Sequence, residues 1–361
     1  MIPVTKPFLP PIEDYQKYID EIWDRNWLTN NGPLVNELEL KLKEYLDIKH
    51  LLFLGNGTIA IQIAIKALNL TGKVITTPFS YVATTSSIVW EGLEPIFVDI
   101  DPFTFNINAD LIEAAITPAV SAILATHCFG NACNIEKIEF IAKKHNLKVI
   151  YDAAHCFGTK YNGKSIFEFG DISTTSFHAT KLFHTIEGGA VFSRNNELIK
   201  AMTCLRNFGH NGPEKFSGIG INGKNSEFHA AMGLCNLKYI RKISEIRKKQ
   251  FLFYSDNFRD LSIKGLSIQE NCEFNYAYYP IIFESENILI KVKNALEEKS
   301  ISPRRYFYPT LSSLPYVKGK FNTPIADYIS QSVLCLPLYF ELKESEQEFI
   351  ISIIRSTLQN V

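Results

Sequence analysis

The chain alternates short, nearly unbroken apolar runs with segments whose apolar residues recur at helical spacing. The apolar runs have the length of single strands and occupy residues 51–54, 74–77, 95–99, 122–127 and 148–152. Helical spacing is found between them, at residues 59–68, 110–116 and 135–145. Strands that are apolar on both faces, each followed by a helix, predict a mainly parallel sheet with helices over both faces.

The same pattern divides the chain into a larger and a smaller part. The sequence predicts a proline-rich arm at 1–10, a helix at 12–27, a turn at 28–33 and, much later, a long charged helix at 239–257. After that last helix, a mixture of short strands and helices is typical of a small α/β unit. We therefore predict a large domain over residues 1–240, which includes the arm, and a small C-terminal domain over residues 241–361.

Composition excludes several kinds of function. The 361-residue chain is 46% hydrophobic and has a formal net charge of −1, which argues against nucleic acids or anionic membranes as main partners. The first residues lack the pattern of a signal peptide, and no apolar run reaches membrane-spanning length. Seven scattered cysteines without a Cys-x-x-Cys pair indicate a reduced, cytoplasmic protein without a structural metal site.

One lysine stands where a buried strand ends. Residues 172–177 predict a strand, and a polar turn with Lys181 and the pair Gly188 and Gly189 leads into a second strand at 190–193. Burial lowers the pKa of a lysine and gives a neutral, nucleophilic amine of the kind that forms Schiff bases. Alone, the stretch also fits a loop lysine that points to water, because lysine is rarely buried.

A glycine turn precedes the first long apolar helix. The strand at 51–54 runs into Gly55-Asn-Gly57-Thr58 and then into that helix. Such a helix start offers free backbone N–H groups to a phosphate. Thr58 fits a helix N-cap equally well. The stretch lacks the Gly-Lys-Ser/Thr ending of a Walker A loop and the Gly-x-Gly-x-x-Gly pattern of dinucleotide sites.

Several polar residues share the carboxyl ends of the predicted parallel strands, where ligands of such sheets bind. Thr58, Tyr81, Asp152 and Lys181 hold these positions, and Ser176 lies close by in the sequence. Together they match the needs of pyridoxal phosphate, which are an amine, an acid at the ring nitrogen, an aromatic face and phosphate donors. Alone, Asp152 fits a strand-end turn and Tyr81 fits a core aromatic residue. Their joint placement favours a cofactor site.

An ordered series of motifs spans nearly the whole chain. It includes Gly55-Asn-Gly-Thr58, Pro78-Phe-Ser-Tyr-Val-Ala-Thr84, Asp152-Ala-Ala-His155, Ser176-Phe-His-Ala-Thr-Lys181, Glu187-Gly-Gly189 and Leu336-Pro-Leu-Tyr339. In this series the chain resembles the sugar-nucleotide aminotransferases of the DegT class. The resemblance implies the fold type I architecture of pyridoxal-phosphate enzymes, an α/β fold with a large, mainly parallel, seven-stranded α/β/α domain and a small C-terminal α/β domain.

The resemblance also implies a role for each site residue. Lys181 is the Schiff-base lysine, Asp152 bonds the pyridine nitrogen, and His155 contacts the phenolic oxygen of the cofactor. Tyr81 stacks on the cofactor ring. The phosphate is held by Gly57, Thr58 and Ser176. Asn222 matches the asparagine that reaches the phosphate of the neighbouring subunit, so the resemblance implies a homodimer with shared active sites, across which the loop at 215–224 passes.

The substrates follow from the same resemblance. L-Glutamate is the usual amino donor of the class. Within it, the chain is most similar to members that convert dTDP-4-keto-6-deoxy-D-glucose into dTDP-4-amino-4,6-dideoxy-D-glucose (viosamine), a sugar of O-antigen or lipopolysaccharide biosynthesis. Amination of a 3-keto-6-deoxy sugar nucleotide is the alternative. Dehydratases of the family replace the lysine by histidine, and a non-catalytic regulator that binds pyridoxal phosphate usually carries a DNA-binding module, for which this chain has no basic segment.

Polar residues outside the motifs are weaker candidates for contacts with the sugar nucleotide. They are Thr29, Asn30, Asn31, His184, Arg206 and Tyr308. His184 fits a packing residue equally well. Two departures from the family pattern affect this set. Lys224 stands where arginine is frequent, and Ser312 follows Tyr308-Pro-Thr-Leu where histidine is frequent.

Overall fold

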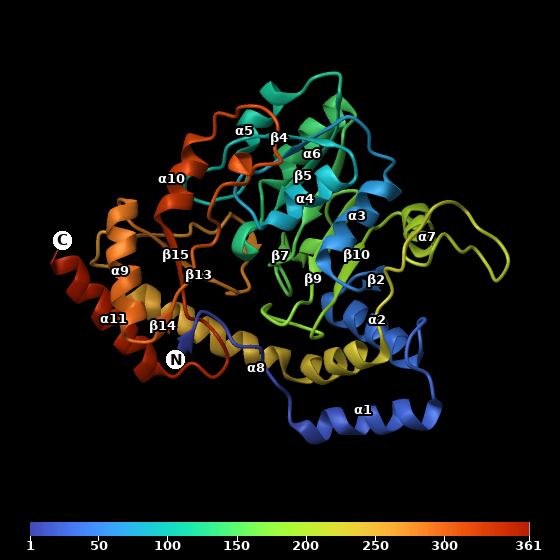
Figure 1. Cartoon of the computed structure of the whole chain (residues 1–361), viewed down its shortest axis with the longest axis horizontal. Coiled ribbons are helices and arrows are strands. Elements are labelled where there is room, and N and C mark those ends of the chain that lie inside the picture. Colours follow the sequence, from blue (N-terminus) through green and yellow to red (C-terminus); the bar gives the residue numbers. More distant parts are fainter. Residues whose placement is uncertain (361) are drawn as a thin grey trace.

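The computed structural model describes residues 1–360, and within them a seven-stranded sheet forms the centre of the larger part (Figure 1). In spatial order its strands are β2 (Leu51–Leu54), β10 (Gly189–Phe192), β9 (Ile172–Ser176), β6 (Lys148–Asp152), β5 (Val120–Thr126), β3 (Lys73–Thr76) and β4 (Glu94–Phe97). β10 is antiparallel to both neighbours, and the remaining neighbours are parallel to one another. The predicted mainly parallel, seven-stranded sheet is confirmed.

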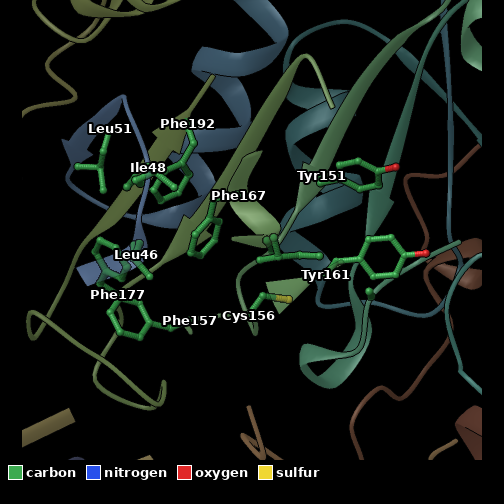
Figure 2. Packing of buried hydrophobic residues seen from close by; sticks show 14 of the residues in the cluster. Leu46, Ile48, Leu51, Tyr151, Cys156, Phe157, Tyr161, Phe167, Phe177 and Phe192 are labelled. Carbon is green, nitrogen blue, oxygen red and sulfur yellow. The ribbon is translucent and has the colours of Figure 1, made fainter. Parts of the chain in front are cut away.

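Both faces of this sheet are buried, because alternate residues of each strand point to opposite sides. Leu52 and Leu54 of β2 belong to the apolar cluster under α3, α4 and α7. Leu51 and Phe53 belong to the cluster on the other face, under α2, α6 and α8. Figure 2 shows part of this second cluster, including Phe192 of β10. Burial on both sides explains why the apolar runs in the sequence are unbroken.

The helices of the larger part largely follow the predicted segments. They are α1 (Ile12–Arg25), α2 (Pro33–Leu46), α3 (Gly57–Ala67), α4 (Val82–Trp90), α5 (Ala109–Ile112), α6 (Ile135–His145) and α7 (Asn196–Leu205). Short 3-10 turns here are η1 (Glu113–Ala115), η2 (Cys128–Gly130) and η3 (Ile166–Glu168), and a fourth, η4 (Leu311–Ser313), belongs to the C-terminal part. The helix at 135–145 is confirmed to the residue, whereas α7 has no counterpart among the predicted helices.

Of the two roles open for Thr58, the N-cap of α3 is wrong by two residues. Asn56, not Thr58, caps the helix, and its side-chain Oδ1 accepts a hydrogen bond from the Ile59 N–H at 2.8 Å. Asparagine is among the best N-cap residues, so the assignment has a local physical cause. Thr58 is consequently free for another use at the helix start.

The C-terminal part has its own small sheet and core. Its antiparallel strands are β11 (Lys264–Gly265), β13 (Tyr279–Ile282) and β15 (Val333–Leu336), and its helices are α9 (Glu286–Glu298), α10 (Pro324–Ser332) and α11 (Glu344–Gln359). The N-terminal arm joins this part, since β1 (Ile2–Pro3) pairs in parallel with β14 (Ile301–Ser302) (Figure 1). A third small sheet contains β12 (Cys272–Glu273), β7 (Lys160–Tyr161) and β8 (Lys164–Ser165).

One long helix connects the two parts. The charged helix predicted at 239–257 is the second part of a single helix, α8 (Glu227–Asn257), of 31 residues, which runs beneath both parts (Figure 1). Ser226 caps its start, with its hydroxyl accepting from the His229 N–H. The domain boundary predicted at 240/241 falls inside this helix and stays a prediction.

Three further features bear on function. Within residues 1–360, every helix is either too short or too polar to cross a membrane. The same residues contain no group of three His, Cys, Asp or Glu side chains arranged to hold a metal ion. All seven cysteines are free thiols.

Candidate functional site

A cavity of about 230 Å³ opens at the carboxyl ends of the central strands. The last residues of β5, β6 and β9, which are Thr126, Asp152 and Ser176, form part of its wall. The predicted cofactor residues that line it are Gly57, Thr58, Tyr81, Asp152, His155, Ser176 and Lys181. The fold thus brings residues from distant segments to one place, and their roles toward a cofactor are taken up below as proposals.

Lys181 lies in the turn after β9, where its backbone N–H donates to the His178 carbonyl at 2.9 Å. Its Nζ donates to the Tyr278 hydroxyl at 3.4 Å. Burial lowers the pKa of Lys181 to about 8, and the Asp152 carboxylate opposes this shift. About a tenth of the amine is therefore neutral one pH unit below that value, a far larger share than for an exposed lysine with a pKa of about 10.4.

Asp152 ends β6 and is held by hydrogen bonds to both carboxylate oxygens. Oδ1 accepts from the Ala154 N–H at 3.1 Å, and Oδ2 accepts from the Thr84 hydroxyl at 2.7 Å. Since Thr84 donates to Asp152, Ser80 must donate to Thr84 at 2.8 Å, and Thr126 donates to Ser80 at 3.0 Å. We call Thr126, Ser80 and Thr84 the hydroxyl chain. Burial raises the pKa of Asp152, and the bond from Thr84 opposes that rise.

His155 lines the cavity as a neutral imidazole. Its Nδ1 accepts a hydrogen bond from the Phe129 N–H at 3.1 Å, so the neutral ring carries its proton on Nε2. Burial holds the pKa of His155 well below its usual range. The ring is nearly parallel to that of Phe307, at an interplanar angle of 3°. His155 is thereby prepared to donate one hydrogen bond from Nε2.

The start of α3 forms another part of the wall. Within residues 1–360 the backbone N–H groups of Gly57 and Thr58 meet no hydrogen-bond acceptor, as is usual for the first turn of a helix. A Cβ on Gly57 would lie 2.9 Å from the Ser176 Cβ, so glycine permits the close approach of α3 to the end of β9. Two free donors at the positive end of a helix suit an anion.

This set of groups fits pyridoxal phosphate. The N–H groups of Gly57 and Thr58 and the Ser176 hydroxyl suit its phosphate. Asp152 suits a ring nitrogen that carries a proton, and the neutral fraction of Lys181 suits an aldehyde carbon. The Tyr81 ring, which is 53% exposed, offers an aromatic face to the same cavity.

Four residues that were predicted to contact the cofactor or the substrate do not line the cavity of the same chain. Asn222 is exposed on the long loop before α8. Thr29, Asn30 and Asn31 form the turn between α1 and α2, where the φ angles of Asn30 and Asn31 are 62° and 55°. Asparagine tolerates this left-handed conformation, so the residues suit the turn itself. Any contact from them to this cavity stays a prediction.

His184, Arg206 and Tyr308 do not line the cavity either. His184 is buried, and its Nε2 lies 2.8 Å from the Phe8 carbonyl oxygen. Arg206 is buried and donates to Glu39 Oε1 at 2.7 Å and to the Phe53 carbonyl at 3.0 Å. Both side chains are used by the fold, which gives no support to their predicted contacts with substrate. Tyr308 lines an adjoining cavity of about 210 Å³.

Residues of the small part complete the wall of the main cavity. Tyr278, Arg304 and Tyr306 line it, although the sequence analysis did not select them. Tyr278 is 97 positions from the lysine that it contacts. Neither periodicity nor a motif marks such residues. The sequence signal that could have pointed to Arg304 is the basic pair Arg304-Arg305, which closely precedes Tyr308, a residue predicted to contact the sugar nucleotide.

Comparisons with known proteins agree with this geometry. Residues 11–355 match the DegT/DnrJ/EryC1/StrS aminotransferase family. The chain is 42% identical over 358 residues to dTDP-4-amino-4,6-dideoxy-D-glucose transaminase of Shigella dysenteriae, with 98% of each chain covered. It is 39% identical over 370 residues to the Escherichia coli protein of the same name, with 99% and 98% covered. The structure of DesI in the presence of its TDP-sugar product superimposes with a TM-score of 0.95 at 28% identity, covering 99% of this chain and 93% of that one.

Proposed function

Because the chain belongs to the DegT/DnrJ/EryC1/StrS aminotransferase family, we propose that it transfers the amino group of L-glutamate to dTDP-4-keto-6-deoxy-D-glucose. The product is then dTDP-4-amino-4,6-dideoxy-D-glucose. The observation that carries the chemistry is the presence of Lys181, with its lowered pKa, beside the buried Asp152 in one cavity. Identities of 42% and 39% to two transaminases named for this product support the choice of sugar.

Pyridoxal phosphate is the cofactor that the family and the cavity favour. When bound, it supplies a ring that accepts the electrons left on the donor Cα after a proton is removed. Asp152 would hold the ring nitrogen, and His155 would donate its Nε2–H to the ring oxygen. The phosphate would be held by Gly57, Thr58 and Ser176. The hydroxyl chain keeps the Asp152 carboxylate oriented for this contact.

Lys181 moves the proton in this proposal. Its neutral Nζ would accept the proton from the Cα of the amino donor and release it again within the same half of the reaction. In the second half it would deliver a proton to C4 of the keto sugar. General acid–base help of this kind typically gives ~10²–10⁴-fold in rate. The deaminated donor, 2-oxoglutarate, leaves before the sugar binds, so we expect ping-pong kinetics.

A homodimer with shared active sites is part of the proposal. The loop between α7 and α8 extends away from the body (Figure 1). Its apolar residues Phe216 and Ile219 are 64% and 92% exposed, which favours a protein interface. Asn222 of the same loop would then reach the partner's cavity. Sedimentation of the purified protein as a monomer at micromolar concentration would contradict this assembly.

Location and pathway complete the proposal. Free thiols throughout the chain fit a reducing compartment such as the cytoplasm. An amino sugar linked to dTDP would serve O-antigen or lipopolysaccharide biosynthesis. Deletion of the gene in the native host should then change the sugar composition of its surface polysaccharide.

One incubation tests the reaction. The protein is mixed with pyridoxal phosphate, L-glutamate and either the 4-keto or the 3-keto dTDP-6-deoxyhexose, and the amino sugar is identified by mass spectrometry and NMR. We expect amination at C4. Exclusive amination at C3 would refute the proposed sugar, and cofactor binding without turnover of either sugar would favour a non-catalytic regulator instead.

A further inference from the structure

Two successive arginines of the small part have different surroundings. Arg305 donates to Glu286 Oε1 at 2.6 Å and to the Gln331 carbonyl at 3.1 Å. Within residues 1–360, Arg304 forms no ion pair and its guanidinium donates no hydrogen bond. The guanidinium lies over the face of Tyr306, with 4.6 Å from Cζ to the ring centroid. The fold therefore uses one guanidinium and leaves the other available.

Arg304 is available at the active cavity. It lines the cavity that contains Lys181 and also the adjoining one. Its backbone is fixed, because its N–H donates to the Cys335 carbonyl at 3.1 Å and its carbonyl accepts from the Cys335 N–H at 2.8 Å. The positive charge of Arg304 is close enough to Lys181 to contribute to the lowering of the lysine pKa, although burial is the main cause.

We propose that Arg304 binds the α-carboxylate of the amino donor, an inference that rests on the proposed function and adds a residue to it. A planar guanidinium fits a carboxylate with two parallel hydrogen bonds. In an amino acid the α-carboxylate is bonded to the same carbon that loses its proton to Lys181. An anion must therefore lie close to Lys181 in the first half of the reaction.

The diphosphate of the sugar nucleotide is the other anion that Arg304 could bind. Its position in the substrate argues against this contact. It is attached to C1 of the hexose, across the ring from the C4 carbon that reacts. When C4 is at Lys181, the diphosphate is separated from the amine by the width of the sugar. Arg304 is thus assigned to the donor and not to the nucleotide.

The test compares Arg304→Met with Arg305→Met, a matched change one residue away. The cofactor-loaded enzyme is mixed with L-glutamate alone, and then the amino form of the enzyme is mixed with the keto sugar nucleotide, each followed by visible absorbance. We expect the half-saturating glutamate concentration to rise roughly ten- to a hundredfold in Arg304→Met, the loss of a charge-assisted contact. The half-saturating sugar concentration should change less than about twofold, and Arg305→Met should resemble the wild type in both steps.

L-Glutamine and the conservative variant Arg304→Lys sharpen the assignment. Glutamine retains the α-carboxylate but lacks the distal charge, so it should lose the same factor as glutamate in Arg304→Met. Arg304→Lys should recover part of the affinity, because it keeps the charge without the planar fork. A loss confined to glutamate would assign Arg304 to the distal carboxylate, and a loss confined to the sugar step would assign it to the diphosphate. Either result overturns the proposal, as does unchanged kinetics.

A binding measurement separates this proposal from the proposed function. Calorimetry of 2-oxoglutarate with the cofactor-free protein requires no reaction. Weaker binding in Arg304→Met than in Arg305→Met supports the contact, and equal binding refutes it. If wild-type enzyme shows no spectral change with any amino acid, the proposed function fails, while the calorimetric comparison still decides whether Arg304 binds carboxylates.

Discussion

Two cavities lie toward opposite ends of β6 and differ in how their charged groups are used. Leu147 and Val149, at the start of β6, line one cavity, and Asp152, at its end, lines the other. The cavity at the start of β6 is the larger, at about 390 Å³, and lies between α6 and the start of β9. Most of its charged groups have local partners, since Lys143 pairs with Glu139 at 2.7 Å and Asp171 accepts from the Val149 N–H at 2.8 Å, while Arg194 is exposed to solvent.

The smaller cavity at Asp152 has charges that the fold leaves open. Within residues 1–360, Lys181 and Arg304 form no direct ion pair, and Asp152 receives its hydrogen bonds from the neutral donors Thr84 and Ala154. Holding the Lys181 amine and the Asp152 carboxylate apart in a buried site is unfavourable unless a ligand uses them. A buried amine and a buried carboxylate that form no ion pair therefore distinguish the functional site here, whereas cavity volume does not.

The largest expected effect comes from removing the amine. Lys181→Ala should lower kcat by at least ~10²-fold, because nucleophile and base are lost together. Lys143→Ala, the matched change at the larger cavity, should leave kcat within about twofold. Formation of 2-oxoglutarate measures both, with circular dichroism to verify folding. Wild-type turnover by Lys181→Ala would refute the comparison.

A pH series examines the lowered pKa of Lys181, whose value of about 8 reflects burial. Only the neutral amine reacts, so the rate at which the cofactor-free protein takes up pyridoxal phosphate should fall about tenfold per pH unit below that value and level off above it. The rate is followed by visible absorbance, relative to a free amine under the same conditions. A rate that still rises tenfold per unit up to about pH 10 would mean that the amine is not shielded.

A third prediction concerns the hydroxyl chain, whose last member, Thr84, donates to Asp152. Thr84→Val removes the donor to Asp152 Oδ2 and should lower kcat/KM by about tenfold, the cost of a hydrogen bond to a charged group. The pKa of Asp152 would rise further, so the carboxylate would be protonated over a wider acidic range and the acid limb of the pH profile should move to higher pH. Thr84→Ser should restore both properties. A uniform loss with an unshifted limb would indicate a packing effect alone.

The smallest effect is expected at the larger cavity. Arg194 is exposed at its wall, and Arg194→Ala should change kcat/KM by less than about twofold and the free energy of unfolding by no more than about 0.5 kcal/mol. Steady-state assays and urea unfolding measure these two quantities. A marked loss of activity would show that the two ends of β6 are coupled, which the exposure of Arg194 to solvent does not predict.

Local pattern was sufficient for much of the fold and for part of the site. The strand at 148–152 and the helix at 135–145 are found as β6 and α6, because periodicity depends only on nearby residues. Asp152 and Lys181 could be assigned to one edge because parallel strands share their carboxyl ends. Local competition produced the errors at Asn56 and in α8, where a better cap and continued helix formation prevailed over the predicted boundaries.

The partners of polar side chains were decided only by the tertiary structure. The bond from Thr84 to Asp152 joins residues 68 positions apart, and the fully packed Arg206 gave no local sign of its burial. Arg304 and Arg305 are adjacent and chemically identical, so no property of either residue distinguishes them in the sequence. Arg305 pairs with Glu286, whereas Arg304 lines the cavity, because packing between distant segments determines where each side chain lies.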